Sequence, residues 1–119
     1  MVFIPVFSQN NQVEGQIYMV VEKMPLYDGA TTDEESNKKL QQFITKRAKE
    51  FNVESKGLVF ISFTINPEGN VINAKVLRGV SEKTDESALA IINDLKPWTA
   101  GIQRGRNVLV EYTVKVEFK

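Results

Sequence analysis

Three groups of residues in this 119-residue chain have types and spacings that could support chemistry. Residues 101–106 combine two glycines with two arginines, as some phosphate-binding loops do. They lack the spacing and the Lys-Ser/Thr ending of such loops, so a connection between a helix and a strand explains them better. Asp85 and Glu86 are adjacent carboxylates, but neighbouring side chains diverge on a helix, where acids near the N-terminus stabilise the helix dipole. Neither group predicts a catalytic residue.

The third group is a set of basic residues within residues 38–49, which occupy the faces of a predicted helix that carry no apolar side chains. Acidic residues nearby balance their charge, so a solvated helix face is favoured over a ligand site. Over the whole chain, 15 basic and 15 acidic residues cancel. Nucleic acid is therefore not an expected partner, because its binding proteins concentrate positive charge.

The chain contains no cysteine and no histidine. It therefore cannot form a disulfide framework, a zinc finger, a Ser-His-Asp triad or a histidine-based metal site. We expect no cofactor, no metal and no enzymatic activity. An enzyme that works through carboxylates and lysine is the alternative, and the sequence offers no convergent set of residues for it.

The N-terminus begins with seven residues that are apolar, and the chain turns polar at Ser8. A membrane span needs about 20 apolar residues, so this stretch is too short to be one, and no other segment qualifies. It is either the remnant of a secretory signal, without its basic start, or an N-terminal strand or arm. We divide the chain into residues 1–16, the arm or signal remnant, and a single domain over residues 17–119.

Alternation and helical spacing predict five elements in the domain. Thr32 and Glu35 are spaced as a capping box at the start of the first helix, and Pro97 ends the second. The expected elements are a strand over residues 17–24, a helix over 33–51, a hairpin of strands 58–65 and 71–77, a helix over 84–96 and a strand over 108–119.

The last strand has the clearest pattern, because apolar and polar residues alternate over its whole length. A sheet with one face packed on the core and the other exposed to solvent is typically antiparallel. The expected fold class is α+β, a two-layer sandwich with an antiparallel β-sheet and two helices packed on one face. The residues expected to be buried are Phe43, Ile44, Phe63, Ile92, Tyr112 and Val114. Trp98 is expected to fill the core.

A series of short motifs, in this order, resembles the TonB C-terminal domain in the form common in Bacteroidetes-type bacteria. The resemblance covers about residues 17–119. Its motifs are Glu22-Lys23-Met24-Pro25, Phe60-Ile-Ser-Phe-Thr-Ile-Asn-Pro-Glu-Gly-Asn-Val71, Lys75-Val-Leu-Arg-Gly79, Asp85-Glu-Ser-Ala-Leu89, Trp98, Gly101-Ile-Gln-Arg-Gly105 and the closing alternating strand.

This resemblance implies a periplasmic, non-enzymatic module that pairs with the N-terminal segment of outer-membrane TonB-dependent transporters. It would transduce energy only if a membrane anchor and a spacer were attached. The alternative is a stand-alone periplasmic adaptor, or a protein that self-associates, as a homodimer, through its C-terminal strand.

The last strand and the loop before it are the predicted partner site, because a backbone at a sheet edge can accept an added strand. A purely structural strand protected by its charges is the alternative. The predicted partner-binding residues are Gln103, Arg104, Val108, Val110, Glu111, Tyr112, Thr113, Val114, Lys115, Val116 and Phe118.

Overall fold

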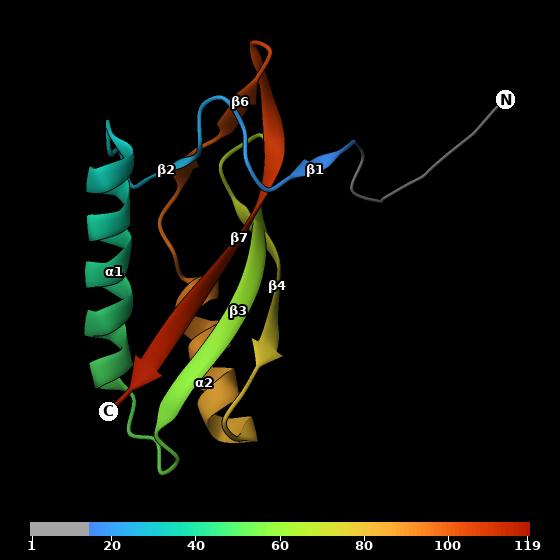
Figure 1. Ribbon diagram of the computed structural model, residues 1–119. Coiled ribbons are helices and arrows are strands. Elements are labelled where there is room, and N and C mark those ends of the chain that lie inside the picture. Colours follow the sequence, from blue (N-terminus) through green and yellow to red (C-terminus); the bar gives the residue numbers. More distant parts are fainter. Residues whose placement is uncertain (1–14) are drawn as a thin grey trace, which may run out of the picture.

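The structure, a computed structural model, describes residues 15–119 (Figure 1). The predicted arm or signal remnant falls mostly on residues 1–14, which lie outside the described residues. The elements in chain order are β1 (Ile17–Tyr18), β2 (Leu26–Tyr27), α1 (Asp33–Glu50), β3 (Gly57–Ile65), β4 (Val71–Arg78), α2 (Glu82–Asn93), β5 (Trp98–Thr99), β6 (Gly101–Gln103) and β7 (Arg106–Phe118).

The main sheet has the strand order β1-β7-β3-β4. Strands β3, β4 and β7 pair antiparallel, as the alternating patterns predict. Strand β1 pairs parallel with β7, with Ile17 opposite Leu109 and Tyr18 opposite Val110. The predicted α+β fold is confirmed, and the sheet is mixed where an antiparallel one was expected.

Both helices pack on one face of the sheet and share one core with it. From α1 the core takes Leu40, Ile44 and Ala48, and from α2 it takes Ala88, Ile91 and Ile92. The inward residues of β3 and β7 also belong to it, namely Val59, Ile61, Phe63, Ile65, Val114, Val116 and Phe118, and Tyr27, Val53 and Trp98 complete it.

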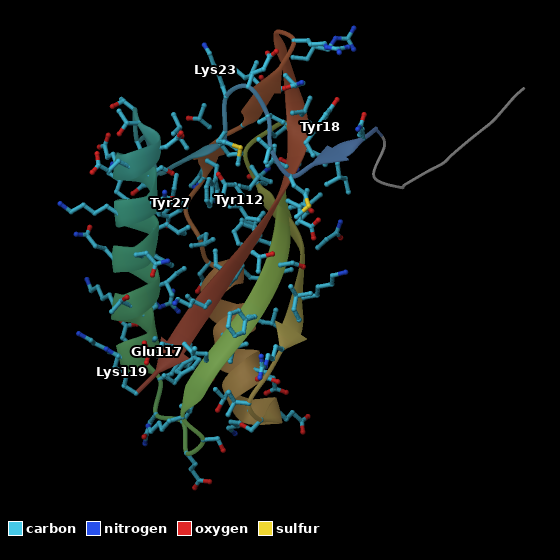
Figure 2. The ribbon with its side chains drawn as sticks, in the orientation of Figure 1. Tyr18, Lys23, Tyr27, Tyr112, Glu117 and Lys119 are labelled. Carbon is cyan, nitrogen blue, oxygen red and sulfur yellow. The ribbon has the colours of Figure 1, made fainter. Side chains whose placement is uncertain are left out.

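Most of the predicted core residues are buried. Ile44, Phe63 and Ile92 are at most 2% exposed, Val114 is 9% exposed, and Trp98 is 5% exposed. Phe43 and Tyr112 are only partly buried, and they pack against the rim of the core. Figure 2 shows Tyr27 and Tyr112 between α1 and the sheet, with Glu117 and Lys119 at the far end of β7.

The predicted strand over residues 17–24 is wrong beyond its first two residues. Only Ile17 and Tyr18 have a partner strand, and the chain then bends, leaving Met19 66% and Val20 79% exposed. Residues that favour strands form them only where a neighbouring edge is available, since strand propensity reflects packing context. Lys23 makes a single bridge to Ile102, and β2 pairs with β5.

Residues 101–106, predicted to be a connection, contain β6 and a tight hairpin turn, and β5 lies just before them. Arg104 and Gly105 have φ angles of 53° and 74°. Two consecutive positive φ angles fit the two-residue hairpin turn that matches strand twist. The last strand consequently begins at Arg106, two residues earlier than predicted. Separately, the second helix spans Glu82–Asn93 instead of the predicted residues 84–96.

Candidate functional site

The C-terminal half of β7 forms a regular sheet edge. Nine consecutive pairs join β3 to β7, from Gly57 opposite Phe118 to Ile65 opposite Val110, without a bulge. On β7, β6 pairs with Arg106–Val108 and β1 pairs with Leu109 and Val110. Within residues 15–119, the stretch 111–118 of β7 therefore has a strand neighbour on one side only.

The opposite edge of the sheet, β4, is irregular. Its pairing with β3 shifts register twice, between Phe60 and Ile61 and between Ser62 and Thr64. Asn73, in the middle of β4, has a φ angle of 55°. Bulges of this kind disrupt the row of backbone groups that an added strand needs, and proteins use them to protect edges. The edge of β7 is thus the better acceptor.

The predicted site is only partly brought together. Val108 and Val110 pair with β6 and β1, so their backbone edge is already occupied. Gln103 and Arg104 lie at the tip of the β6–β7 hairpin, at the end of the molecule away from the C-terminus (Figure 1).

Both tip residues contact Glu22. The backbone N–H of Glu22 donates to Gln103 Oε1 at 2.9 Å, and the N–H of Arg104 donates to Glu22 Oε1 at 3.0 Å. They anchor the segment that follows β1, which sequence reasoning did not anticipate. This arrangement gives Gln103 and Arg104 no contact with a strand bound at residues 111–118.

Side chains of the remaining predicted residues divide between the two faces of β7. Val114, Val116 and Phe118 are buried in the core, with Tyr112 partly buried beside them. Thr113 and Lys115 are exposed on the other face, and Glu111 is half-buried there. Partner recognition at this edge would thus rely on backbone groups and on the outward side chains.

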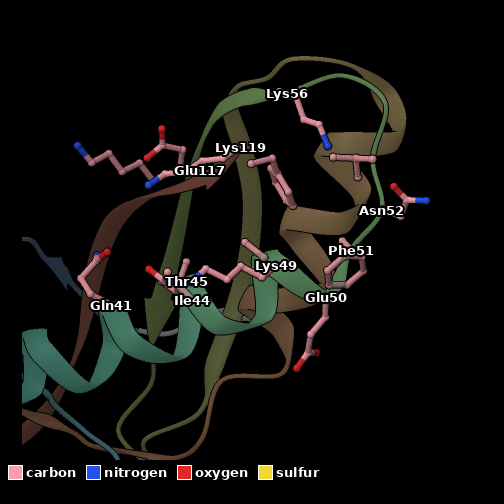
Figure 3. A pocket seen from close by; sticks show the side chains of 14 residues that line it. Gln41, Ile44, Thr45, Lys49, Glu50, Phe51, Asn52, Lys56, Glu117 and Lys119 are labelled. Atoms are coloured by element: carbon pink, nitrogen blue, oxygen red, sulfur yellow. The ribbon is translucent and has the colours of Figure 1, made fainter.

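A groove of about 470 Å³ runs between the C-terminal half of α1 and the free edge of β7 (Figure 3). Its apolar floor includes Ile44 and Ala48 of α1, Val53 of the following loop and Phe118 of β7. Charged side chains from all three segments surround the floor, and Lys49 faces the end of β7 from the helix. Sequence reasoning missed this groove, since its walls come from residues about 70 positions apart.

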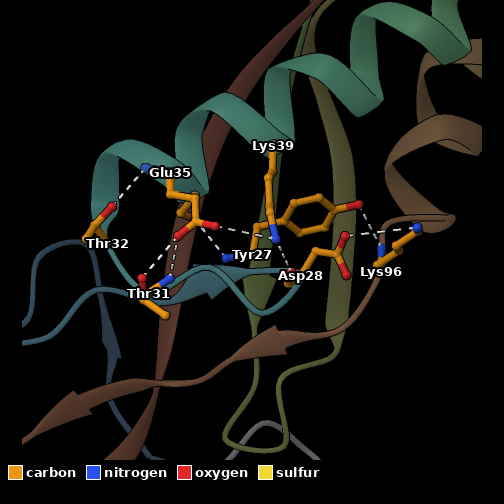
Figure 4. Close-up of polar contacts among 8 residues, drawn as sticks. Tyr27, Asp28, Thr31, Thr32, Glu35, Lys39 and Lys96 are labelled. Carbon is orange, nitrogen blue, oxygen red and sulfur yellow. Dashed lines mark hydrogen bonds and ion pairs between the residues drawn. The ribbon is translucent and has the colours of Figure 1, made fainter.

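The position of α1, one wall of the groove, is set by contacts at its N-terminus (Figure 4). The N–H of Glu35 donates to Thr32 Oγ1 at 3.1 Å, as the predicted capping box requires. The Glu35 carboxylate accepts from the N–H and the hydroxyl of Thr31 instead of from Thr32, and these bonds lower the pKa of Glu35. Lys39 Nζ donates to the Asp28 carbonyl at 2.9 Å, which ties the helix to the residue that follows β2.

Two tyrosines hold the segment before α1 against the sheet. The Tyr27 hydroxyl accepts from the N–H of Lys96 at 3.1 Å, and burial raises its pKa. The Tyr112 hydroxyl donates to the Pro25 carbonyl at 3.3 Å. Burial, with a smaller contribution from Asp33, raises the pKa of Tyr112 to about 12. Both groups stay protonated at neutral pH, so they act as fixed hydrogen-bonding and packing groups.

Comparison with protein families identifies the fold's relatives. The model of the family described as Gram-negative bacterial TonB protein C-terminal matches residues 47–119, more than half of the chain. The chain belongs to this family. TonB C-terminal domains are periplasmic and interact with outer-membrane transporters. The matched part includes β3 and β7, and hence the free edge.

A solved structure is also similar to the chain. The NMR solution structure of the TonB C-terminal domain from Helicobacter pylori is 22% identical in sequence, with a TM-score of 0.48. The likeness covers 78% of this chain and 89% of that chain. The comparison with curated proteins gives no match. No helix within residues 15–119 is long and apolar enough to span a membrane.

Proposed function

We propose that the chain binds the N-terminal segments of outer-membrane TonB-dependent transporters by adding them as a strand to β7. The added strand pairs with residues 111–118 on the side away from β3. The role is one of binding, without catalysis, and it is exercised in the periplasm. Energy transduction would further require a membrane anchor and a spacer attached to this domain.

The free, regular edge of β7 is the observation that carries this proposal. In strand addition the main chain provides affinity and alternate side chains provide specificity. An edge of eight residues extends over about 27 Å at the usual rise of a strand. It can therefore pair with a short extended peptide along its whole length, and the family membership indicates which class of partner supplies that peptide.

Backbone-modified peptides test the pairing without altering the protein. Peptides from the N-terminal segments of TonB-dependent transporters of the same genome would be titrated by calorimetry. Each would be compared with a version in which alternate amides are N-methylated. Methylation removes N–H donors from one edge of a peptide strand and leaves its side chains in place. Methylation of the edge that faces β7 should abolish binding, and methylation of the other edge should preserve it.

Substitution of Thr113 provides the complementary test on the protein. Thr113→Pro removes one backbone donor and distorts the strand, whereas Thr113→Val keeps the donor and the shape of the strand. Circular dichroism first establishes that the proline variant is folded. A folded proline variant that binds like the wild type would place the partner elsewhere on the surface. A dissociation constant of about 1 mM corresponds to a binding free energy of about −4 kcal/mol. If the wild type binds no transporter peptide even at millimolar concentration, the transporter proposal fails.

Pairing between two copies is the second candidate, because a free strand edge can accept the same edge of another molecule. Sedimentation velocity over a wide concentration range separates the two. A dimer that transporter peptides dissociate would mean that both partners use residues 111–118. A dimer that the peptides leave intact would place self-association on another surface.

A further inference from the structure

The groove beside β7 lies where the side chains of an added strand must fit. Neighbouring strands are about 4.8 Å apart, so a strand paired with residues 111–118 lies directly above the groove. Its inward side chains then face the floor formed by Ile44, Ala48 and Phe118. These three residues are less than 9% exposed, so they form a fixed apolar surface. Apolar side chains on the partner's inward face would pack against this surface.

The rim of the groove carries excess positive charge in a chain whose net charge is zero. Four lysines, Lys49, Lys56, Lys115 and Lys119, line it together with two glutamates, Glu50 and Glu117, which leaves a side-chain charge of +2. Glu50 is already paired with Arg47 at 3.2 Å. Within residues 15–119, none of the four lysines forms an ion pair.

Lys115 shows how an added strand would use this charge. On β3 its cross-strand neighbour is Phe60, so no acid lies directly opposite it on that side. An added strand would place a residue opposite Lys115 on its other side, and opposite charges at such positions are favourable. Lys49 from α1 and Lys56 from the loop before β3 line the groove, into which the partner's inward side chains would point (Figure 3).

We propose that the occupant of this groove is an extended segment that carries acidic side chains beside its apolar ones. This proposal rests on the strand addition proposed above and specifies the chemistry of the partner. The backbone of β7 accepts many extended peptides, and the lysine rim selects the acidic ones among them. Selection acts where the partner runs past residues 115–118, which is where the groove meets the strand edge.

A charge series of one peptide tests the selection. The probe is a blocked peptide with a core of alternating valine and threonine that carries three glutamates at one end. Its matched forms carry three glutamines or three lysines. Each is made with the charged residues at either end, because the direction of pairing decides which end reaches the groove. Each exposed ion pair contributes little and the three glutamates act together, so at low salt the glutamate form should bind about tenfold more tightly than the glutamine form.

Two double variants with equal charge change locate the effect. Lys49→Glu with Lys56→Glu reverses charge in the groove. Lys38→Glu with Lys83→Glu, the control, reverses two exposed lysines outside it. We expect the groove variant to lose the preference for glutamate and to prefer the lysine peptide, and we expect the control to keep the wild-type preference.

The outcomes separate this inference from the function on which it rests. Equal binding of the three peptides, or equal effects of the two double variants, would overturn the acidic selection while strand addition stands. If none of the peptides binds, and N-methylated transporter peptides bind as well as unmodified ones, strand addition itself is overturned. A preference for glutamate that disappears only in the groove variant supports both.

Discussion

Four aromatic side chains join the middle of β7 to the segments around it. Tyr112 stacks on Phe63 with ring centroids 6.0 Å apart, and Trp98 lies 5.2 Å from Tyr112 and 5.1 Å from Tyr27. Such pairs contribute about 0.5–1.5 kcal/mol each beyond burial. They hold β7 in place directly beside its free edge, so that the edge is preformed for a partner.

The alternation of residues 108–118 is sufficient to predict which of these side chains face inward. It does not show which backbone groups remain free. That depends on the pairing of Ile17 and Tyr18 with β7. This contact joins residues more than 90 positions apart and consists of only two residue pairs.

Phe63 is the residue whose truncation should weaken the domain most clearly. It is 1% exposed and contacts both Trp98 and Tyr112. Phe63→Ala should lower the free energy of unfolding by about 3–5 kcal/mol, through lost burial and the cavity left behind. Leu58, on the outer face of the same strand and 38% exposed, gives the control, since Leu58→Ala should cost less than about 1 kcal/mol. Urea unfolding measures both, and equal losses would show that the inward face of β3 is misassigned.

The raised pKa of Tyr112 predicts how stability changes in alkali. Burial moves this pKa from its ordinary value of 10.0 to about 12 in the folded protein. Between these values the unfolded chain loses the proton while the folded protein keeps it. The stabilising contribution is therefore complete below pH 10 and is lost as the pH rises towards 12. The free energy of unfolding of Tyr112→Phe should fall less steeply than that of the wild type over this range. Parallel curves from urea unfolding at each pH would contradict the assignment.

Among the elements, the β3–β4 hairpin is tied to β5 through its turn. Gly69 has a φ angle of 87°, and its carbonyl accepts from the N–H of Trp98 at 2.9 Å. Asn66 organises the same turn, because its side chain accepts from the N–H groups of Glu68 and Asn70. The Pro and Gly residues between the two strands predict this turn, but no local sequence pattern predicts its contact with Trp98.

Helix caps and long strands could be predicted because their signals are local. Thr32, predicted to cap the first helix, accepts from the N–H of Glu35 at 3.1 Å. Strands β1, β2, β5 and β6 have only two or three residues each, too few for alternation to be recognised. These strands form because the fold brings their pairing partners, which are distant in the sequence, close to them in space.

Two glycine substitutions separate backbone strain from close packing. A Cβ on Gly69 would lie 2.0 Å from the Trp98 carbonyl oxygen, whereas a Cβ on Gly105 would meet nothing within 4 Å. Both glycines have positive φ angles, so both substitutions carry about 1–2 kcal/mol of conformational strain. Gly69→Ala should cost clearly more, because the turn must also move away from Trp98. Thermal and urea unfolding compare the two variants, and similar losses would argue against the close contact.

At the scale of the whole molecule, the domain leaves two sheet edges with different properties. The β4 edge is bulged, and the β7 edge is regular but covered at one end by β1 and β6. Within residues 15–119, both helices lie on one face of the sheet and no helix lies on the other (Figure 1). A partner strand thus has one favourable position, and the groove beside α1 lies next to it.

Residue-resolved amide hydrogen exchange by NMR tests the central claim, that residues 111–118 of β7 accept a partner strand. The N–H groups of this stretch that point away from β3 should exchange rapidly in the free protein. A saturating transporter peptide should slow their exchange at least tenfold, and the N–H groups of β4 should be unaffected. Protection confined to β4 or to another surface, with residues 111–118 unchanged in the bound state, would contradict the account.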